Sequence, residues 1–459
     1  MQNLWLELDG LIAIAGLGIY VISSHTLQQR RHPSAAVAWV VSLLLLPYIA
    51  LPLYLMFGFR KVGKFRSPAT RSDLTLPASD TNTLCHRTQE LAAIMSLPDA
   101  SGYHQLNIHE NGEQALQVLR NMIASAAHSI DLCTFIFAHD KLGDEIAQNL
   151  ILRAGEGIRI RLLVDGIGAY LGGHTDFTRL SNAGIQVTLF VPPLRSTMRG
   201  RTNLRNHRKT VIVDNAWLWC GGRNLATEYF GDGDASPWTD LSFDLHGPLA
   251  HQAQQQFELD WAFACATDEP AAGPVVNTAS GTAIGQLIAS GPDQRDDTYY
   301  TLLVSSFFGA RKRIIATTPY FVPDPTLLMS LTLAARRGVA VDLLLPKRSN
   351  HRLADFARHR ALRELVSAGG RVWMYPQMIH AKAVVIDDEI AFAGSANLDQ
   401  RSLFLNYEMM VCFYQPNDVQ RFSQWIEHRI GKAAPYHAKR PGIGVEIAEG
   451  LLLWLAFQL

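Results

Sequence analysis

The residues best suited to chemistry are two copies of one pattern, His-x-Lys-x-x-x-x-Asp. The copies consist of His207, Lys209 and Asp214, and of His380, Lys382 and Asp387. The chain has only nine lysines, and two of them follow a histidine at the same spacing. A single short motif often arises by chance, but two copies in similar local sequence are much rarer. We therefore interpret the six residues as parts of one catalytic site.

These residue types suit the cleavage of a phosphodiester. A neutral imidazole can attack phosphorus as a nucleophile, and a protonated one can give a proton to the leaving alcohol. An unperturbed imidazole titrates at about pH 6.5, so one histidine can serve each role near neutral pH. Lysine supplies a positive charge for a phosphate oxygen. Two such half-sites that face each other predict a reaction through a phosphohistidine intermediate.

The sequence around each motif predicts a β-hairpin, because apolar or β-branched runs flank a short polar turn. In the first copy, a two-residue turn at Asp214 and Asn215 pairs position 207 with position 222 and places Asn224 just beyond that pair. The second copy predicts the same arrangement. A turn at Asp387 and Asp388 pairs position 380 with position 395 and places Asn397 just beyond that pair. Each hairpin then gathers a histidine, a lysine and an asparagine at its open end.

The two motif aspartates are expected to lie away from the histidines. Asp214 follows His207 by seven positions, which a straight strand spans with about 20 Å at roughly 3.3 Å per residue. Asp214 and its counterpart Asp387 belong to the catalytic motif, but we interpret them as turn or structural hydrogen-bonding residues.

No metal or other cofactor is expected. The sequence has no His-Glu-x-x-His, no paired Cys-x-x-Cys and no Walker glycine loop, and these are patterns by which metal and nucleotide sites are recognised. The lysines can take the place of a metal. Five cysteines at scattered positions form no disulfide framework or zinc spacing. Three of them, Cys133, Cys220 and Cys412, lie in apolar runs and are expected to be buried thiols.

Two acidic residues downstream of the histidines are candidates to orient them. Asp240 follows His207, and Glu408 follows His380. A carboxylate bound to the far ring nitrogen fixes the tautomer of a histidine and favours its protonated form. On spacing alone, each acid is at least as well explained as an ordinary exposed carboxylate.

The chain resembles the phospholipase D superfamily and, within it, the bacterial cardiolipin synthases. The resemblance covers essentially the whole chain. Besides the two motifs, four tracts carry it: residues 205–209, 238–248, 317–323 and 397–408. It implies two pseudo-symmetric α/β halves, each a mixed sheet flanked by helices, whose motifs meet at one site.

The resemblance also implies roles for single residues. His207 is expected to be the nucleophile and His380 the general acid and base, although the near-symmetry of the site leaves this order open. Asp240 is expected to orient His207, and Glu408 to orient His380. The phosphate is expected to contact two lysines, two asparagines and a serine: Lys209, Lys382, Asn224, Asn397 and Ser395.

The two copies differ at two points. The first has Gly222 where the second has Ser395, so one hydroxyl contact is expected to be absent on the first side. Asp240 is one methylene shorter than Glu408, so its hold on its histidine is expected to be weaker.

Composition limits the class of protein. The 459 residues are 48% hydrophobic and carry no net charge, which argues against a nucleic-acid partner because such proteins usually have a basic surface. We expect a membrane hairpin, a linker, two halves and an apolar tail: 1–67, 68–107, 108–275, 276–436 and 437–459. Each half repeats a strand, a helix and two strands: 130–137, 144–155, 159–165 and 185–191, then 314–321, 325–338, 340–345 and 371–375.

The N-terminal region predicts a transmembrane helical hairpin. Residues 35–59 carry no formal charge and are long enough to cross about 30 Å of hydrocarbon, and residues 10–24 could form a second span. Pro47 and Pro52 would kink the longer segment, so a re-entrant geometry stays open. A cleaved signal peptide is not expected, because acidic rather than basic residues precede the apolar stretch.

Basic residues set the expected orientation. Arg30 and Arg31 lie between the apolar segments, and Arg60, Lys61, Lys64 and Arg66 follow the second one. With two spans, the N-terminus and the catalytic body share one side, which the positive-inside rule places in the cytoplasm. We therefore expect a multi-pass protein of the bacterial inner membrane. The tail, 443–459, is expected to form an interfacial helix with Trp454 near the headgroups or to pack against the body.

The activity that the resemblance implies is a phosphatidyl transfer. One phosphatidylglycerol would give its phosphatidyl group to another, which yields cardiolipin and glycerol, so the expected partners are phosphatidylglycerol and membrane lipids. Water as the acceptor would make the same site a phospholipase D, and phosphatidylethanolamine as the acceptor stays open. A scaffold that binds lipid without turnover is disfavoured by the intact motifs. The sequence leaves the oligomeric state open.

Overall fold

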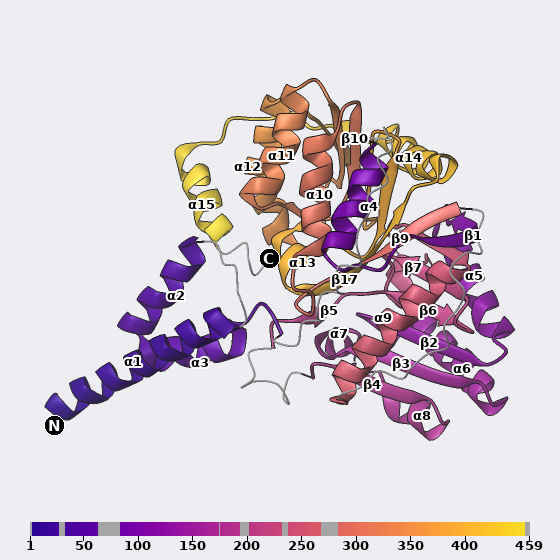
Figure 1. Cartoon of the computed structure of the whole chain (residues 1–459), viewed down its shortest axis with the longest axis horizontal. Helices are drawn as coiled ribbons and strands as arrows, with labels where there is room; N and C mark the ends of the chain where they lie inside the picture. The colour runs from indigo at the N-terminus through magenta and orange to yellow at the C-terminus, as the bar shows by residue number, and fades with distance from the viewer. Residues whose placement is uncertain are drawn as a thin grey trace.

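One continuous sheet runs through both halves of the catalytic body (Figure 1). The computed structural model describes residues 2–26, 33–62, 83–173, 175–192, 202–231, 237–267 and 283–454. Within these ranges, the strand order is β18-β13-β12-β10-β14-β15-β17-β9-β1-β8-β7-β6-β2-β3-β4. The central strands β1 and β9 pair antiparallel, and the order read outward from them matches strand for strand as far as β4 and β13, beyond which the second half adds β18. The two expected halves are therefore present, but they share a single sheet.

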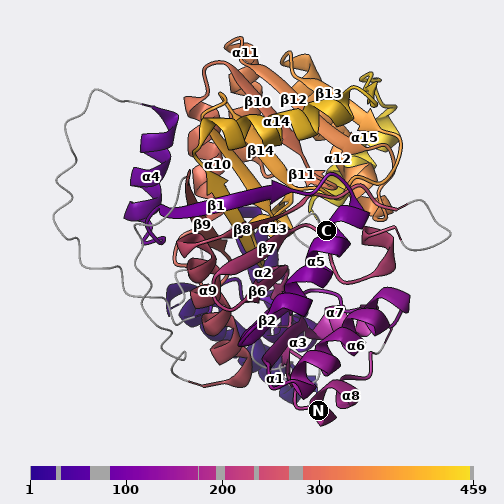
Figure 2. The same ribbon diagram turned by 90° about the vertical axis from the view of Figure 1, so that its right-hand side faces the viewer.

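The first half contains these strands: β1 (Ser101–Ile108), β2 (Ser129–Thr134), β3 (Arg159–Asp165), β4 (Gln186–Phe190), β5 (Arg205–Asn206), β6 (Thr210–Val213), β7 (Trp217–Gly221) and β8 (Ser242–His246). Its helices are α5 (Gly112–Ser125), α6 (Lys141–Gly155), α7 (Gly166–Leu171), α8 (Phe177–Asn182), a 3-10 turn (Thr227–Tyr229) and α9 (Pro248–Cys265). The strands β2, β3 and β4 run parallel and read as apolar runs, because helices cover both faces of the sheet. Figure 2 shows α9 on one side of β2 and β6, with α5 and α6 on the other.

The second half contains these strands: β9 (Ala283–Ser290), β10 (Arg313–Thr317), β11 (Phe321–Val322), β12 (Ala340–Pro346), β13 (Arg371–Tyr375), β14 (Ala383–Ile386), β15 (Ile390–Gly394), β16 (Leu398–Asp399), β17 (Asn406–Phe413) and β18 (Ala434–Pro435). Its helices are α10 (Thr298–Gly309), α11 (Pro325–Arg336), α12 (Arg352–Ser367), α13 (Gln400–Phe404) and α14 (Pro416–Ile430). The predicted repeat of a strand, a helix and two strands is confirmed in both halves, with α6 and α11 as the matching helices. The predicted burial of Cys133, Cys220 and Cys412 is also confirmed.

The two motif hairpins form where the sequence predicts them, but their register differs by one residue. Val213 pairs with Trp217 across the first turn, and Ile386 pairs with Ile390 across the second. Three residues, not two, therefore make each turn, and the expected pairs of 207 with 222 and 380 with 395 are wrong. Each turn begins with two residues of positive φ, as in Asp214 at 50°, a conformation that Asp and Asn tolerate better than other side chains.

The expected linker, 68–107, contains ordered structure. Residues 84–94 form the helix α4 (Leu84–Ile94), and β1 begins at Ser101 and lies in the middle of the sheet. The linker assignment is therefore wrong for this part, because β1 alternates buried and exposed residues too irregularly to stand out as a strand. Residues 68–82 lie outside the described ranges, as do residues 268–282 of the boundary between the halves.

The N-terminal region forms three helices: α1 (Gln2–Thr26), α2 (Pro33–Leu45) and α3 (Pro47–Phe57). The expected continuous segment 35–59 is divided at Leu46, because Pro47 has no N–H to continue the helix and disfavours helical geometry in the residue before it. Among the described residues, no helix combines the length and the hydropathy required to cross a membrane. Four of the basic residues that set the expected membrane orientation lie outside the described ranges: Arg30, Arg31, Lys64 and Arg66.

The three helices expose a large apolar surface, with Leu11, Ile14, Ile22, Leu45 and Ile49 each more than half exposed. Monomeric soluble proteins rarely expose contiguous apolar surface of this kind. Figure 1 shows these helices projecting from one side of the body.

The C-terminal helix α15 (Ile443–Trp454) lies beside α12. Arg363 of α12 donates a 3.1 Å hydrogen bond to the buried carboxylate of Glu449. The other side of α15 exposes Ile443, Val445 and Ile447. The helix therefore packs against the body, as one of the two expectations had it, and still carries an apolar side.

Candidate active site

Each motif histidine is held by the backbone of the opposite half. The short strand β5 of the first half pairs in parallel with the start of β17 in the second, and the N–H of His207 donates to the carbonyl of Tyr407 at 2.9 Å. On the other side, the N–H of His380 donates to the carbonyl of Thr239 at 2.7 Å. These crossed pairings bring the open ends of both hairpins to the junction of the halves.

The carboxylates that face the histidines are exchanged between the halves. The Nδ1 atom of His207 lies 3.2 Å from Oε1 of Glu408, and that of His380 lies 2.8 Å from Oδ2 of Asp240. The expectation that each acid serves the histidine of its own half is therefore wrong. The crossed strand pairings are the cause, because they place His207 beside the strand that carries Glu408 and His380 beside the segment that carries Asp240. Nε2 is then the ring atom that can face a substrate, although in His380 it also lies 3.0 Å from Nζ of Lys382.

The Glu408 carboxylate is fixed by three side chains. The hydroxyls of Ser395 and Ser402 each donate to it at 2.5 Å, and the Asn406 amide donates at 3.2 Å. Burial alone would raise the pKa of Glu408, but the adjacent His207 and Lys209 and these hydrogen bonds hold it below its usual value. The sequence predicts Ser395 as a phosphate ligand. Its hydroxyl instead serves Glu408, so that role is corrected to positioning the carboxylate.

The Asp240 carboxylate has a different support. Gly222, which matches Ser395 by sequence, lies so close that a Cβ there would approach Oδ1 of Asp240 to 2.2 Å. The backbone N–H of Leu241 donates to the same oxygen at 2.6 Å, and the buried guanidinium of Arg223 donates to the Asp240 carbonyl at 2.6 Å. Gly222 therefore does more than lack a hydroxyl for the phosphate. It provides the space in which the carboxylate of Asp240 reaches His380.

We expect Gly222→Ala to lower turnover by at least about tenfold, because the added methyl displaces the Asp240 carboxylate from His380 and weakens a hydrogen bond to a charged group. Steady-state assays at saturating lipid measure this effect. Gly155→Ala is the matched control, since a Cβ there meets nothing within 4 Å, and it should leave turnover unchanged. Equal activities of the two variants would contradict the role given to Gly222.

The two motif lysines lie beside the histidines. Nζ of Lys209 donates to the His207 carbonyl at 2.7 Å, and Nζ of Lys382 lies 2.8 Å from Nδ1 and 3.0 Å from Nε2 of His380. Both ammonium groups are buried, and burial lowers the pKa of Lys209 to about 8 and that of Lys382 to about 7. A buried cation of this kind gains most from an anionic partner.

Both imidazoles are kept neutral when no anion is bound. Burial and the Lys209 ammonium lower the pKa of His207, although Glu408 opposes this shift. Burial and the Lys382 ammonium lower the pKa of His380 to about 3, against the opposing charge of Asp240. Lys382 also lowers the pKa of His207, and Lys209 that of His380, so the two half-sites share one electrostatic environment. An anionic phosphate between them would raise the pKa of both rings.

The two predicted asparagines lie at the same junction with different partners. The amide of Asn224 donates to the Tyr229 hydroxyl at 2.8 Å, and its Oδ1 accepts from the N–H of Ile136 at 3.3 Å. Oδ1 of Asn397 is buried and accepts no hydrogen bond within the described residues.

The motif aspartates lie at the far ends of the hairpins, as the spacing predicts. The Asp214 carboxylate accepts from the N–H groups of Ala127, His128 and Ser129 at 2.7 to 2.8 Å. Asp387 accepts in the same way from the first residues leading into β10, at 2.6 to 2.9 Å. Each aspartate therefore ties its hairpin turn to the neighbouring strand, and neither contacts a motif histidine.

Aromatic side chains that the sequence did not single out surround the imidazoles. The Phe135 ring lies 5.0 Å from that of His207, and the rings of Tyr229 and Trp238 lie 5.2 and 5.6 Å from that of His380. The Tyr320 ring lies 6.5 Å from that of His380. Trp238 and Tyr320 lie within the tracts 238–248 and 317–323 that carry the resemblance, whereas Phe135 and Tyr229 lie outside all four tracts. Together they make a low-dielectric wall that strengthens the charge interactions within the site.

Metal ligands do not converge here. Across the ranges that the structure describes, no three His, Cys, Asp or Glu side chains are placed to hold a metal ion. The arrangement instead offers two imidazoles, two carboxylates on their Nδ1 atoms and two ammonium groups, which suit nucleophilic and acid-base chemistry on a phosphodiester.

Comparison with known proteins gives the family context of this site. A family model described as "Cardiolipin synthase, PLD-like domain" matches residues 119–261 and 303–430, and one described as "Phospholipase_D-nuclease N-terminal" matches residues 14–58. Cardiolipin synthase A of Pseudomonas aeruginosa is 33% identical over 87% of this chain and 85% of its own length. Cardiolipin synthase 2 of Bacillus anthracis is 30% identical over 90% of this chain and 84% of its own length.

Solved structures support the fold. Phosphatidylserine synthase from Haemophilus influenzae superposes with a TM-score of 0.64 at 13% identity, covering 82% of this chain and all of that one. The first family model spans both motif hairpins and both exchanged carboxylates, Asp240 and Glu408. On the breadth of the family match and the identity to these relatives, the chain belongs to the cardiolipin synthase family of phospholipase D-like proteins.

Proposed function

We propose that this protein is a cardiolipin synthase, a phosphatidyltransferase that makes cardiolipin and glycerol from two molecules of phosphatidylglycerol. The observation that carries the proposal is the pair of imidazoles, that of His380 buried and that of His207 partly exposed, each with a carboxylate of the opposite half on Nδ1 and a lysine beside it. The family membership and the names of the relatives point the same way. No nucleic acid is proposed as a partner, since the chain carries no net charge.

In the first step, Nε2 of His207 attacks the phosphorus of one phosphatidylglycerol. The bond from phosphorus to the glycerol headgroup breaks, and His380 gives its proton to the departing oxygen. The anionic lipid raises the pKa of His380 on binding, so the ring takes up from solvent the proton that this step needs. Glu408 stabilises the positive charge that develops on His207.

In the second step, the neutral His380 removes the proton from a headgroup hydroxyl of a second phosphatidylglycerol. That oxygen attacks the phosphorus, the bond to His207 breaks, and cardiolipin leaves. An alcohol held next to the phosphohistidine competes with water through its high effective concentration. The aromatic wall around His380 restricts the access of water to the intermediate.

Purified protein with phosphatidylglycerol labelled in both the acyl chains and the headgroup tests this proposal. Labelled cardiolipin and one free glycerol per cardiolipin are the expected products. Phosphatidic acid in place of cardiolipin would make the protein a phospholipase D, and no product would leave a lipid-binding role. A parallel reaction with added phosphatidylethanolamine establishes whether that lipid also serves as an acceptor.

We also propose that α1, α2 and α3 attach the protein to the bacterial inner membrane as a multi-pass element, with the catalytic body in the cytoplasm. Their exposed apolar side chains and the basic residues around them support this placement. Reporters fused after Arg66 test it: a reporter that works only in the cytoplasm should be active. Activity of a periplasm-only reporter at the same position would contradict the orientation.

The lysines predict the pH dependence of the reaction. Because the pKa of Lys382 is about 7 and that of Lys209 about 8, the free enzyme loses two phosphate-binding charges as the pH rises through this range. We expect kcat/KM to fall more steeply above about pH 7, because the proton that His380 takes up already makes it fall with rising pH. The acid limb lies below about pH 6.5 because the pKa of His207 is lowered.

The alkaline limb can be assigned with Lys382→Arg. Arginine stays charged at these pH values, so the limb should move upward by about one pH unit even where the maximum rate is lower. A kcat/KM profile of the unaltered protein that stays flat from pH 7 to about pH 9 would show that the lysine charges do not govern lipid binding.

A further inference from the structure

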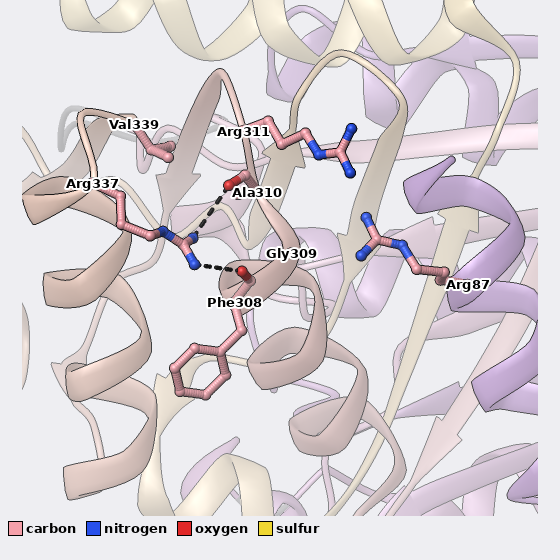
Figure 3. Close-up of a pocket in the computed structure, with 7 residues that line it drawn as sticks. All are labelled: Arg87, Phe308, Gly309, Ala310, Arg311, Arg337 and Val339. Carbon is pink, nitrogen blue, oxygen red and sulfur yellow. Dashed lines mark hydrogen bonds between the residues drawn. The ribbon is translucent and has the colours of Figure 1, made fainter. Parts of the chain in front are cut away.

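A second cluster of cationic side chains lies at the opposite end of the hairpin from His380. A hollow of about 410 Å³ opens beside the turn between α10 and β10, and Arg87, Arg311 and Arg337 line it. Figure 3 shows the three guanidinium groups arriving from α4, from the turn and from the end of α11, with Arg87 and Arg311 extending toward each other. The turn is bound to Asp387, so the hollow lies roughly 20 Å along the hairpin from the imidazole.

Arg337 has a structural role in this cluster. Its guanidinium donates to the carbonyls of Phe308 at 2.7 Å and of Phe307 and Ala310 at 3.2 Å, which are the free carbonyls at the C-terminal end of α10. A cation is favourable there because it neutralises the negative end of the helix dipole. This contact fixes the shape of the turn on which Arg311 is carried.

Arg87 and Arg311 have no such acceptors among the described residues, and Nε of Arg87 is buried without a hydrogen-bond partner. The acids of the neighbouring turn are engaged elsewhere. Asp387 accepts three backbone N–H groups, Asp388 pairs with Arg313, and Glu389 accepts from the N–H of Leu84 at 2.7 Å. Two guanidinium groups that share a hollow without a counter-charge repel each other at close range.

The first half provides an internal comparison. Asp214 binds Ala127 as Asp387 binds Arg311, so Ala127 stands where the second half has Arg311. There the end of α5 is capped by Arg153, which donates to the carbonyl of Ala126 and pairs with Glu156. The same turn of the fold is therefore neutral in the first half and carries an excess of positive charge in the second. The duplicated architecture does not require the arginines.

We propose that Arg87 and Arg311 form a binding site for an oxyanion of the phosphate class, separate from the catalytic centre. Guanidinium groups are well suited to phosphate, because each can donate two parallel hydrogen bonds to its oxygens. Gly309 fits this use: a Cβ there would lie 3.2 Å from one terminal nitrogen of Arg87, so the glycine leaves room for the guanidinium beside the turn. A bound anion would join α4 to the α10–β10 turn. This contact would hold in place the segment that leads from α4 into the central strand β1.

Equilibrium dialysis of the full chain in detergent with labelled inorganic pyrophosphate tests the proposal. The expected result is two classes of site, one of them catalytic. The double variant R87Q/R311Q should weaken binding at the second class by at least about tenfold, through loss of two charge-assisted contacts. K312Q/R336Q removes the same charge from exposed neighbours that do not line the hollow, and it should bind as the unaltered protein does. Phosphatidyl transfer by both variants should stay within about twofold of the unaltered rate, which shows that they are folded.

The source of the anion is distinguished in nanodiscs. Binding of pyrophosphate at this site is compared in discs of phosphatidylcholine alone and in discs that also contain phosphatidylglycerol. If a lipid headgroup is the natural ligand, binding should be weaker in the discs with phosphatidylglycerol, because the headgroup competes. Equal binding in both kinds of disc indicates a water-soluble phosphate compound. Identical dialysis curves for the unaltered protein and R87Q/R311Q, or an equal loss in the charge-matched control, would overturn the proposal.

Discussion

His207→Asn and His380→Asn should each lower kcat by about 10⁴-fold or more, equivalent to about 5 kcal/mol of transition-state stabilisation. The two imidazoles act on the same phosphorus, one as nucleophile and one as proton carrier, so neither can replace the other. Asparagine keeps much of the side-chain volume and removes the titratable ring. Steady-state formation of cardiolipin from labelled phosphatidylglycerol measures the effect.

The double variant should be little worse than either single one, because residues that act as one unit lose their function together. His428→Asn is the matched control, since this histidine is exposed on α14, and its turnover should be unchanged. Turnover near the unaltered level in either single variant would show that the two motifs do not share one reaction.

Trapping identifies the nucleophile. Acid-labile label from a phosphatidylglycerol substrate, located by peptide mass mapping after a rapid quench, should lie on His207. Label on His380 would reverse the two roles and keep the mechanism, whereas cardiolipin formation with no labelled histidine would exclude the covalent route.

Glu408→Gln and Asp240→Asn should each lower kcat by about a hundredfold to a thousandfold. Each substitution keeps the shape of the side chain and removes the charge that stabilises the imidazolium. The exchanged arrangement makes a more specific prediction about which histidine responds. Glu408 raises the pKa of His207, so Glu408→Gln should lower the pKa of His207 and leave that of His380 nearly unchanged.

Asp240→Asn should affect the other histidine, lowering the pKa of His380 and leaving that of His207 nearly unchanged. Histidine NMR titrations of selectively labelled protein in detergent distinguish the two rings. Ser395→Ala is a graded control, because it removes one of the hydrogen bonds to Glu408 and keeps the charge, and its loss of kcat should be about tenfold. A shift of the His380 pKa in Glu408→Gln would contradict the exchange between halves.

The sequence predicted the parts of this protein that depend on contiguous residues. The duplicated motif, the strand and helix repeat and the hairpin turns with their aspartates all follow from spacing along one strand or across one turn. Asp214 and Asp387 illustrate this, since seven positions along a strand already separate them from the histidines and make them turn residues. The register of the hairpins was missed by one residue, because turn length depends on backbone dihedral angles that the residue types alone do not fix.

Only the tertiary structure decided which groups act together. Asp240 and His380 are 140 positions apart, and their contact follows from strand pairings between two halves whose contact surfaces leave no periodic signal in the sequence. The same pairing turned Ser395 from an expected phosphate ligand into a support for Glu408 and made Gly222 a space for Asp240. A duplicated sequence describes each half-site by itself. The closure of one half on the other gives each histidine its carboxylate, because the nearest partner in space belongs to the other copy.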